Sequence, residues 1–402
     1  MAGTENRIGY LIPEFPSQTH SFFWREIQAL ENRHGYRTQI FSTRRPSQKV
    51  MHEWATEAEA TYLFPPSPTS WPRLLWGLLS RGHRVLSRPD ARRLLLTPGV
   101  WPFLLMAIRL GQLCQDNDIS HLHVHSCGNS ALIAAFCHLL YDLPYSIVLH
   151  GPLRDYGPYQ DFKWRRALFA FIITDKLAQE MAERMPDTVQ RSRIVPMGVD
   201  TDHFSPPEGL SSDGNAPFRW FCCARLNWVK GYDVLLRALA HIRQTHPELD
   251  LSLFIAGEDE QGGQGYRLEL EKLRAELGLE EQVTLLGATT QKDVLQQLHM
   301  ADGFVLASRA EPLGVAYMEA MACGLPTVGT AAGGVPELIE SGRDGLLVPP
   351  EDPEALAGAM ISIMSDGELR SALSHHGRSR IVDHFGASRS ADALAVALQD
   401  FT

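Results

Sequence analysis

Two carboxylates, Glu311 and Glu319, flank the expected start of a short helix in the sequence Glu-Pro-Leu-Gly-Val-Ala-Tyr-Met-Glu. Gly314 lets the backbone approach a ligand closely, residues 315–322 have a helical pattern, and Gly324 suits the left-handed residue that closes a helix. The N–H groups of a first helical turn have no partners within the helix and carry partial positive charge, so they suit a phosphate. A phosphate site with a hydroxyl-accepting carboxylate on either side fits a nucleotide-sugar, in which phosphates lie between two sugars.

Two cations, Arg225 and Lys230, follow the strand-like residues 220–224 and lie on either side of a turn. A guanidinium can hold phosphate oxygens through two parallel hydrogen bonds, and an ammonium acts as a compact point charge. The pair therefore fits a diphosphate, although two solvent-exposed cations near a helix start are a slightly better interpretation of the pair taken alone. Gly257 and Gly287 end two further strand-like runs beside the same site, where their backbone either contacts the base or simply turns.

Strand-like and helix-like segments alternate through both halves of the chain, which is typical of parallel sheets with helices on both faces. We therefore predict an α/β fold with two doubly wound, Rossmann-like domains that face each other across a cleft. The expected domains are residues 1–205 and 218–380, with a turn-rich linker at 206–217 and a C-terminal helix within 381–402 that packs back on the first domain. Ligands of such domains bind at the carboxyl ends of the strands.

Composition narrows the classes of protein. A chain of 402 residues that is 44% hydrophobic and 21% charged indicates a globular protein of two or three domains. The six cysteines form no CxxC pair, which favours a reducing cytosol over disulfides or structural zinc. No signal peptide or membrane span is evident, so we expect a cytoplasmic location. The formal net charge is −10, and no nucleic-acid partner is expected.

A basic stretch interrupts the first half of the chain between residues 67 and 110. It contains seven arginines and a single acidic residue, Asp90, with tryptophans and leucines between them. Such a segment can lie in the headgroup layer of an anionic membrane, which would place the protein peripherally at the inner membrane face. A helical subdomain with its leucines inward and its arginines in solvent is an equally good interpretation.

Taken together, the motifs resemble the retaining, nucleotide-sugar-dependent glycosyltransferases of family 4, which have the GT-B fold. The resemblance covers essentially the whole chain and is strongest over residues 194–350. Its elements are Pro-Met-Gly-Val-Asp at 196–200, Ala-Arg-Leu-Asn-Trp-Val-Lys-Gly at 224–231, Ile-Ala-Gly at 255–257, the stretch 311–319, Gly-Gly-Val-Pro-Glu at 333–337 and Gly-Arg-Asp-Gly-Leu-Leu-Val-Pro at 342–349. The form Phe-Pro-Ser-Gln-Thr at 15–19 is similar to the colanic-acid and exopolysaccharide branch, and it lacks the glycine pair that many members have there.

The resemblance implies roles for the residues of the second half. Arg225 and Lys230 would hold the donor diphosphate and neutralise the charge that builds on it as the glycosidic bond breaks. Glu311 would orient the transferred sugar, and Glu319 would accept hydrogen bonds from the ribose. Backbone N–H groups at the helix start would assist, from Leu313, Gly314, Val315 and Ala316. In the family, retention is attributed to attack from the front face, so no protein nucleophile is required.

The first half would bind the acceptor. His150 follows the strand-like residues 145–149 and matches the family's histidine near the reaction centre, with a buried structural histidine as the alternative. The other candidate contacts to substrate are Ser17, Gln18, Thr19, His125 and Asp155. His123 and His125 share one face of a strand, but no third metal ligand can be identified and the family needs no metal. The acidic run at residues 258–260 is better interpreted as a solvated loop than as a cation site. We therefore expect no metal and no cofactor beyond the donor.

We predict a metal-independent, retaining glycosyltransferase that moves a hexosyl unit from a UDP- or GDP-sugar to a hydroxyl group in polysaccharide biosynthesis. The acceptor would be a saccharide or a lipid-linked saccharide. A soluble transferase for a small-molecule acceptor, such as an aminocyclitol or a natural product, is the first alternative. A catalytically silent nucleotide-binding relative is the second.

Overall fold

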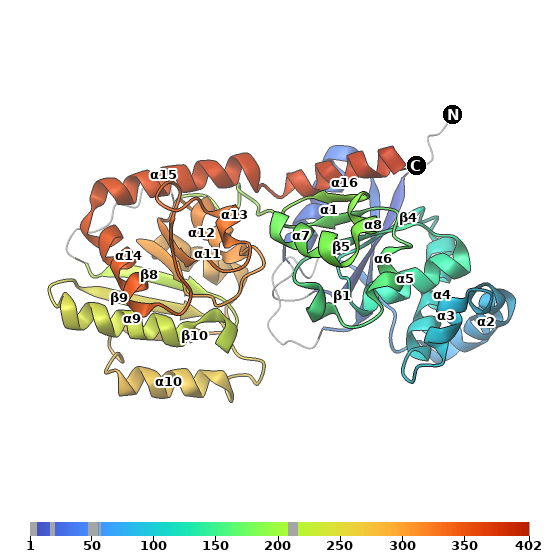
Figure 1. Cartoon of the computed structure of the whole chain (residues 1–402), viewed down its shortest axis with the longest axis horizontal. Coiled ribbons are helices and arrows are strands. Elements are labelled where there is room, and N and C mark those ends of the chain that lie inside the picture. The colour runs from blue at the N-terminus through green and yellow to red at the C-terminus, as the bar shows by residue number, and fades with distance from the viewer. Residues whose placement is uncertain (1–5, 17–20, 47–54, 56–57, 208–215, 402) are drawn as a thin grey trace. The chain divides into compact units, whose positions relative to one another are not determined.

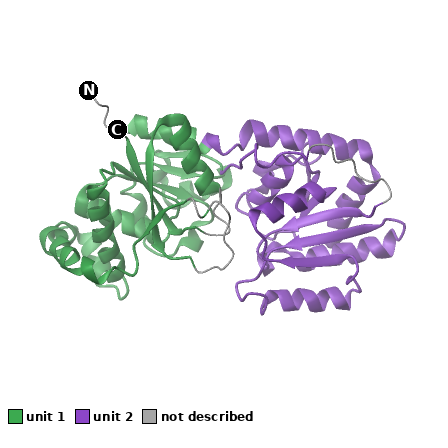
Figure 2. Cartoon of the chain, turned by 180° about the vertical axis from the view of Figure 1, so that it is seen from behind, with its two compact units in different colours: residues 1–196, 390–402 green, residues 197–389 purple. Residues whose placement is uncertain are grey.

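The computed structural model describes residues 6–16, 21–46, 55, 58–207 and 216–401. The chain forms two compact units, an N-terminal unit of residues 1–196 and 390–402 and a C-terminal unit of residues 197–389 (Figure 2). The division after residue 196 comes earlier than the boundary expected at 205, and the expected linker at 206–217 falls within the C-terminal unit.

The N-terminal unit is built on a seven-stranded sheet in which all strands are parallel (Figure 1). The strands are β1 (Arg7–Glu14), β2 (Arg37–Arg44), β3 (Ala60–Tyr62), β4 (His121–Val124), β5 (Tyr145–Leu149), β6 (Ala170–Ile172) and β7 (Ser192–Ile194). Their order, β3-β2-β1-β4-β5-β6-β7, is the Rossmann order. Successive strands are added on one side of β1 up to β3 and on its other side from β4 onwards. All residues of β4 and β5 are buried, as expected for central strands that are covered on both faces.

Helices cover this sheet. They are α1 (Ser21–His34), α5 (Asn129–Tyr141), α6 (Gln160–Trp164), α7 (Asp175–Arg184) and α8 (Pro186–Val189). The basic stretch between β3 and β4 folds into α2 (Trp71–Leu86), α3 (Pro89–Leu95) and α4 (Trp101–Asp116). The C-terminal helix α16 (Ser388–Phe401) also contacts this unit: its Asp400 pairs with Arg193 at 2.6 Å, and the Phe401 ring stacks on Phe169.

The C-terminal unit repeats the same plan with six parallel strands in the order β10-β9-β8-β11-β12-β13. The strands are β8 (Phe218–Cys223), β9 (Leu251–Ala256), β10 (Val283–Gly287), β11 (Gly303–Leu306), β12 (Thr327–Thr330) and β13 (Leu346–Val348). The helices are α9 (Tyr232–Thr245), α10 (Tyr266–Glu276), α11 (Gln291–Met300), α12 (Val315–Ala322), α13 (Val335–Leu338), α14 (Pro353–Ser365) and α15 (Gly367–His384). Here the strand order reverses between β8 and β11. The prediction of two doubly wound, Rossmann-like domains is confirmed.

Two further predictions concern the chain as a whole. All six cysteines are free thiols, as their spacing predicted. Among the described residues, no helix combines the length and the apolar character that are needed to cross a bilayer.

Candidate active site

Lys230 and Glu311 meet at the carboxyl ends of β8 and β11, the two neighbouring strands at which the strand order of the C-terminal sheet reverses. Lys230 ends the short 3-10 turn Trp228–Lys230 after β8, and Glu311 lies in the loop after the neighbouring strand β11. The Lys230 Nζ atom is 2.5 Å from Glu311 Oε2, and Ser308 Oγ lies 3.4 Å from the same oxygen. Only 8% of Glu311 is exposed, so the ammonium and the carboxylate neutralise each other in a largely dry environment. The structure thus brings together two of the residues that the sequence singled out.

Glycines around this pair are required by close backbone approach. Gly231 has φ +65°, and a Cβ atom there would lie 1.9 Å from the carbonyl oxygen of Ala307. Gly333 has φ +62°, and its Cβ would lie 1.9 Å from the carbonyl oxygen of Glu311. The Gly334 N–H donates to that same oxygen at 2.9 Å. The Gly-Gly motif at 333–334 therefore fixes the backbone of Glu311, a role that the sequence did not assign.

The helix start that was expected to bind phosphate is formed by α12. Gly314 precedes it with φ +109°, and the following N–H groups begin the helix without intrahelical acceptors. Tyr317, fully buried in the first turn, donates from its hydroxyl to the Leu306 carbonyl at 2.7 Å and ties the helix to β11. The backbone N–H groups of the predicted phosphate contacts therefore lie shortly after Glu311, on a turn that the Tyr317 hydroxyl ties to β11. These contacts are Leu313, Gly314, Val315 and Ala316.

Arg225 is placed differently from Lys230. Its side chain is 54% exposed, and its guanidinium is 3.6 Å from Glu260, whose side chain is 83% exposed. Of the two cations, Lys230 is the one that pairs with Glu311. A joint grip by Arg225 and Lys230 on one anion therefore stays a prediction.

Arg309 supports the turn that carries Lys230, and the sequence reading missed it. Its guanidinium donates to both carboxylate oxygens of Asp233, each at 2.8 Å, and to Glu351 at 2.7 Å. It also lies over the Trp228 ring, and its own backbone N–H donates to the Val229 carbonyl at 2.7 Å. The hydrogen bonds from Arg309 lower the pKa of Asp233. Arg309 stands only two residues before Glu311, but its partners come from distant parts of the chain.

The strand ends that carry Gly257 and Gly287 pack tightly against each other. The Gly257 N–H donates to the Gly287 carbonyl at 2.8 Å, and a Cβ on Gly257 would lie 1.9 Å from the Ala224 carbonyl oxygen. Close packing therefore accounts for Gly257 without a ligand. A contact of these two loops with a base stays a prediction.

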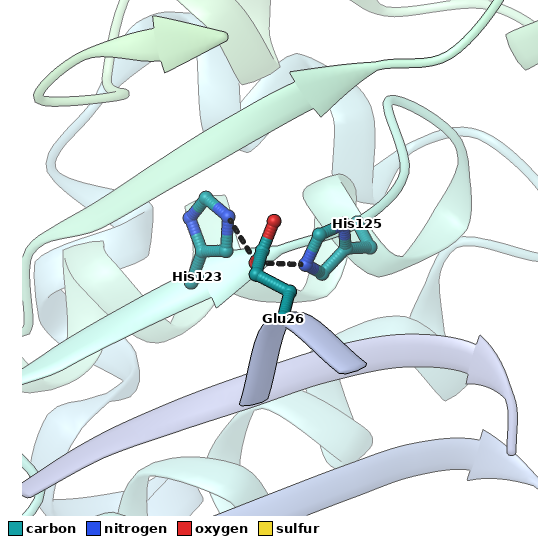
Figure 3. Close-up of side chains that lie close together, drawn as sticks. All are labelled: Glu26, His123 and His125. Carbon is teal, nitrogen blue, oxygen red and sulfur yellow. Dashed lines mark hydrogen bonds and ion pairs between the residues drawn. The ribbon is translucent and has the colours of Figure 1, made fainter. Parts of the chain in front are cut away.

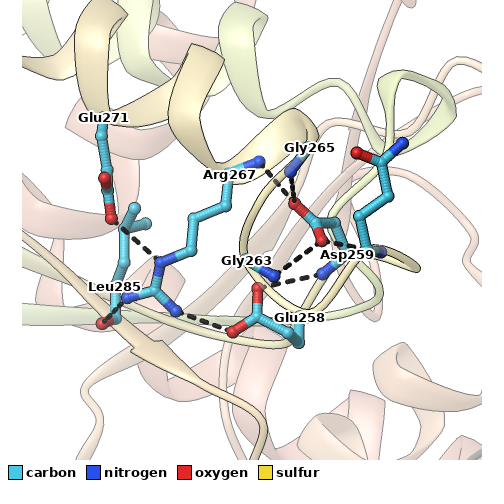
Figure 4. Close-up of polar contacts among 8 residues, drawn as sticks. Glu258, Asp259, Gly263, Gly265, Arg267, Glu271 and Leu285 are labelled. Carbon is cyan, nitrogen blue, oxygen red and sulfur yellow. Dashed lines mark hydrogen bonds and ion pairs between the residues drawn. The ribbon is translucent and has the colours of Figure 1, made fainter.

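The acidic run at 258–260 was expected to be a solvated loop, and the structure corrects this for two of its three residues (Figure 4). Asp259 is buried and accepts hydrogen bonds from four backbone N–H groups, those of Gln261, Gly263, Gly265 and Arg267. Desolvation opposes its ionisation, but these donors outweigh it and lower its pKa. Glu258 pairs with Arg267 at 2.8 Å. The loop is thus an internally satisfied cap of α10.

Glu319 lies partly exposed on α12, and burial raises the pKa of its carboxyl group to about 8. The structure gives its side chain no hydrogen-bond partner among the described residues. A carboxyl group held in this way is available to accept hydrogen bonds from hydroxyl groups of a ligand, in keeping with the expected contact to a ribose.

We expect Glu319→Gln to raise the free energy of unfolding at neutral pH by roughly 1–3 kcal/mol, because glutamine never ionises in this environment. Because the folded-state pKa lies near 8 and the ordinary value is 4.5, the stability contributed by the neutral carboxyl group is complete below about pH 4.5 and is lost as the pH rises through 8. The gap between variant and wild type should therefore widen from about pH 4 to about pH 8 in urea unfolding. A gap that does not depend on pH would contradict this assignment.

In the N-terminal unit, three side chains form a chain of hydrogen bonds at the ends of β4 and β5. Glu26, on α1, lies between His123 and His125 (Figure 3). Its Oε1 atom is 3.1 Å from His125 Nε2, and His125 Nδ1 is 3.2 Å from His150 Nε2. The Tyr10 hydroxyl donates to the same Glu26 oxygen at 3.2 Å. The structure therefore brings His125 and His150 together and adds Glu26, which the sequence did not suggest.

Of the other candidate acceptor contacts, Asp155 lies among the described residues and has no hydrogen bond to this cluster there. Asp155 is exposed on a short turn, and its carboxylate lies 3.8 Å from the neighbouring Arg154. Ser17, Gln18 and Thr19 lie outside the described residues.

The same cluster supplies the third potential metal ligand that the sequence left unidentified. Ligand atoms of Glu26, His123 and His125 all lie within 4.8 Å of one another. Burial lowers the pKa of His123 well below its ordinary value, so this ring is neutral. Its Nδ1 atom is held by Ser146 Oγ at 2.7 Å. The donor set of two imidazoles and one carboxylate suits zinc chemically, and the expectation of no metal stays a prediction.

Part of the chain is similar in sequence to known glycosyltransferases. Residues 215–380 match the family model for glycosyl transferases group 1. The chain is 32% identical over 229 residues to a D-inositol 3-phosphate glycosyltransferase of Corynebacterium jeikeium, which covers 55% of this chain and 54% of the relative. It is 30% identical over 205 residues to a GDP-mannose-dependent alpha-(1-6)-phosphatidylinositol monomannoside mannosyltransferase of Mycolicibacterium smegmatis, which covers 48% and 52%. The chain thus spans about half the length of these curated relatives.

The fold also matches solved structures over nearly its whole length. The Anabaena protein HepE, in complex with UDP and glucose, has a TM-score of 0.76 at 18% identity and covers 98% of this chain and 100% of its own. A glycosyltransferase from Rickettsia africae has a TM-score of 0.76 at 15% identity and covers 99% of both chains. The match to the family model supports the resemblance seen in the motifs over residues 215–380, which is less than half of the chain.

Proposed function

We propose that this protein is a retaining glycosyltransferase that moves a hexosyl unit from a nucleotide-sugar to a hydroxyl group of a saccharide or a lipid-linked saccharide. The observation that carries the proposal is the Lys230–Glu311 pair beside the start of α12, at the carboxyl ends of adjacent strands. Support comes from relatives whose names specify glycosyl or mannosyl transfer and from a structural neighbour that holds UDP and glucose.

In the proposed reaction, the Lys230 ammonium, which pairs with Glu311 in the structure, also pairs with the donor diphosphate. The ammonium, the N–H groups at the start of α12 and Arg225 stabilise the diphosphate as the glycosidic bond breaks. Glu311 is then available to accept a hydrogen bond from a hydroxyl group of the transferred sugar. The leaving phosphate takes the proton of the acceptor hydroxyl, which attacks from the same face and retains the anomeric configuration. The chain's own cations supply the charge, and the proposal includes no metal.

The direct test is donor hydrolysis without acceptor, measured with UDP-, GDP- and ADP-sugars. We expect slow hydrolysis of one donor class, with the sugar released in its original anomeric configuration as read by proton NMR. Binding of a nucleotide-sugar with no hydrolysis and no transfer to any acceptor would instead support the silent nucleotide-binding alternative. Inversion at the anomeric carbon would contradict the proposed geometry of attack.

The acceptor class has two candidates. The mannosyltransferase relative is named for a phosphatidylinositol mannoside, which favours a lipid-linked acceptor at the cytoplasmic face of a membrane. The relative named for D-inositol 3-phosphate favours a soluble small molecule. A place in exopolysaccharide synthesis rests on the motif at residues 15–19, whereas the two relatives point to inositol-containing acceptors. Profiling transfer to inositol phosphates, phosphatidylinositol mannosides and polyprenyl-linked sugars separates these candidates.

A further inference from the structure

Helix α2 exposes an apolar face that the rest of the described chain does not cover. Trp71, Leu75, Leu79 and Leu86 follow helical spacing and form one stripe, with Trp76 beside it. Trp76 is 70% exposed and Leu79 is 79% exposed. These five side chains are called the docking face below. Contiguous exposed apolar groups of this size mark a binding surface more often than an accident of folding.

The docking face is a fixed part of the fold. Helix α2 buries its opposite side, which includes Leu74 and Val85, and packs closely on α4 through Gly77. A Cβ atom on Gly77 would lie 2.5 Å from the Ile108 side chain. Since α2 cannot rotate without breaking this packing, its apolar stripe stays turned away from the core.

The charge around the docking face is positive. Arg88, Arg92 and Arg93 are exposed just after α2 and within α3, and the structure gives them no ion pair among the described residues. The sole acidic residue of this stretch, Asp90, is occupied by Arg166 at 2.5 Å. Three unpaired guanidinium groups thus lie beside exposed tryptophan and leucine side chains. This combination complements a surface with an anionic outer layer over an apolar interior.

A basic cavity opens beside Trp76. Its volume is about 520 Å³, and it lies between α2, α4 and α5. Arg73, Arg81, Arg84 and His83 line it. Arg73 pairs with Asp116 at 2.6 Å and Arg84 pairs with Asp142, whereas Arg81 has no carboxylate partner among the described residues. Arg81 lies flat over the Tyr141 ring, 4.4 Å from its centre, which holds the guanidinium in place. The planar guanidinium of arginine can hold two oxygens of a phosphate through parallel hydrogen bonds.

We propose that the docking face inserts into the interface of an anionic lipid bilayer, with a lipid phosphate held in the cavity beside Trp76. Tryptophan favours the headgroup layer because its ring is apolar and its N–H is polar. A second copy of the chain fits less well, because it would bring like-charged arginines together. The inference deepens the proposed function and rests on it for its purpose, since it names the surface on which a lipid-linked acceptor is met. Vesicle binding itself requires no catalysis, so the two can fail separately.

The test is co-sedimentation of the full chain with vesicles of phosphatidylglycerol and phosphatidylcholine, compared with phosphatidylcholine alone, at low and high salt. We expect binding to the anionic vesicles that weakens with salt. Trp76→Ser/Leu79→Ser should weaken it at least about tenfold through lost apolar burial. Arg88→Gln/Arg92→Gln/Arg93→Gln should weaken it by a similar or larger factor, because each basic residue near an anionic surface strengthens binding about fivefold.

Matched variants elsewhere on the surface control for composition. Leu268→Ser/Val382→Ser removes two exposed apolar side chains, and Arg165→Gln/Arg184→Gln/Arg343→Gln removes the same formal charge from exposed sites. Both should bind vesicles like wild type. Absence of binding at low salt, or equal losses in test and control variants, would overturn the proposal. Concentration-dependent dimerisation that Trp76→Ser/Leu79→Ser abolishes, without vesicle binding, would assign the face to a second copy.

The cavity has its own comparison. Arg81→Gln should weaken binding to anionic vesicles by more than the single exposed change Arg343→Gln and should leave binding to phosphatidylcholine unchanged. If the two single variants behave alike, the cavity does not hold a lipid phosphate. Transfer to a water-soluble acceptor should be the same in all of these variants, because none alters the candidate active site.

Discussion

Lys230→Ala is expected to lower kcat by roughly 10²–10³-fold, because it removes a preorganised positive charge from the place where the leaving diphosphate develops negative charge. The ammonium lies on the short turn after β8 and is held 2.5 Å from Glu311, so it is already in position before the donor arrives. The same change leaves a mostly buried carboxylate without its cation, which should cost about 1–3 kcal/mol of stability. Steady-state turnover and thermal unfolding, measured on the same preparation, separate the two effects.

A second substitution shows whether Lys230 acts on the donor or merely holds Glu311. If the lysine only positions the carboxylate, adding Lys230→Ala to Glu311→Gln should cost little more than Glu311→Gln alone. If it also grips the diphosphate, the double variant should lose a further large factor. Arg343→Ala, which removes an exposed cation from the same unit, is the control. Turnover of Lys230→Ala within about threefold of wild type would contradict the proposed electrostatic role.

The fold could be predicted from the sequence because its determinants are local and periodic. Buried apolar runs of strand length alternate with amphipathic segments, and this pattern already implies two parallel sheets. Glycines that need a positive φ or a close backbone approach, such as Gly231 and Gly314, mark the turns at the strand ends. Residues at those turns converge because the carboxyl ends of parallel strands share one edge of a sheet.

Specific partnerships could not be predicted, because they join residues that are far apart in the chain. Lys230 was expected to bind the diphosphate and Glu311 the transferred sugar. Their direct pairing, between residues 81 positions apart, was not predicted. The acidic run at 258–260 was expected to be a solvated loop, but Asp259 is buried and accepts hydrogen bonds from four backbone N–H groups that follow it in the chain. The composition of a loop therefore does not predict its exposure when its polar groups form hydrogen bonds within the protein.

The cluster in the N-terminal unit shows the same limit. His123 and His125 were expected to share one face of a strand, and the sequence identified no third ligand for them. Glu26 comes instead from α1, 99 residues before His125 in the chain. A single glutamate on an amphipathic helix carries no local signal that distinguishes it from a solvated one, and here the packing of α1 on the sheet decides.

We expect Glu26→Gln to lower kcat by roughly 10–100-fold with little change in the KM for the donor. This expectation rests on the place near the reaction centre that the family resemblance implies for His150, which Glu26 would orient through His125. The Glu26 carboxylate accepts a hydrogen bond from His125 Nε2–H, so that His125 Nδ1 carries no proton and accepts a hydrogen bond from His150 Nε2–H. His150 is then held in one tautomer, with its Nδ1 atom as an acceptor. Glutamine keeps the size of the side chain but removes the charge that selects this arrangement.

Two measurements distinguish this positioning role from a purely structural one. Nitrogen-15 NMR of labelled histidines should show His150 as the Nε2–H tautomer in wild type and a mixture in Glu26→Gln. The acid limb of the pH–rate profile should move to lower pH in the variant, because loss of a nearby negative charge disfavours protonated imidazole. Glu31→Gln is the matched control, since Glu31 lies on the same helix and bonds only Thr38 among the described hydrogen bonds. A stoichiometric divalent ion that copurifies with wild type and is lost in Glu26→Gln would instead make the cluster a metal site, and the tautomer relay would be wrong.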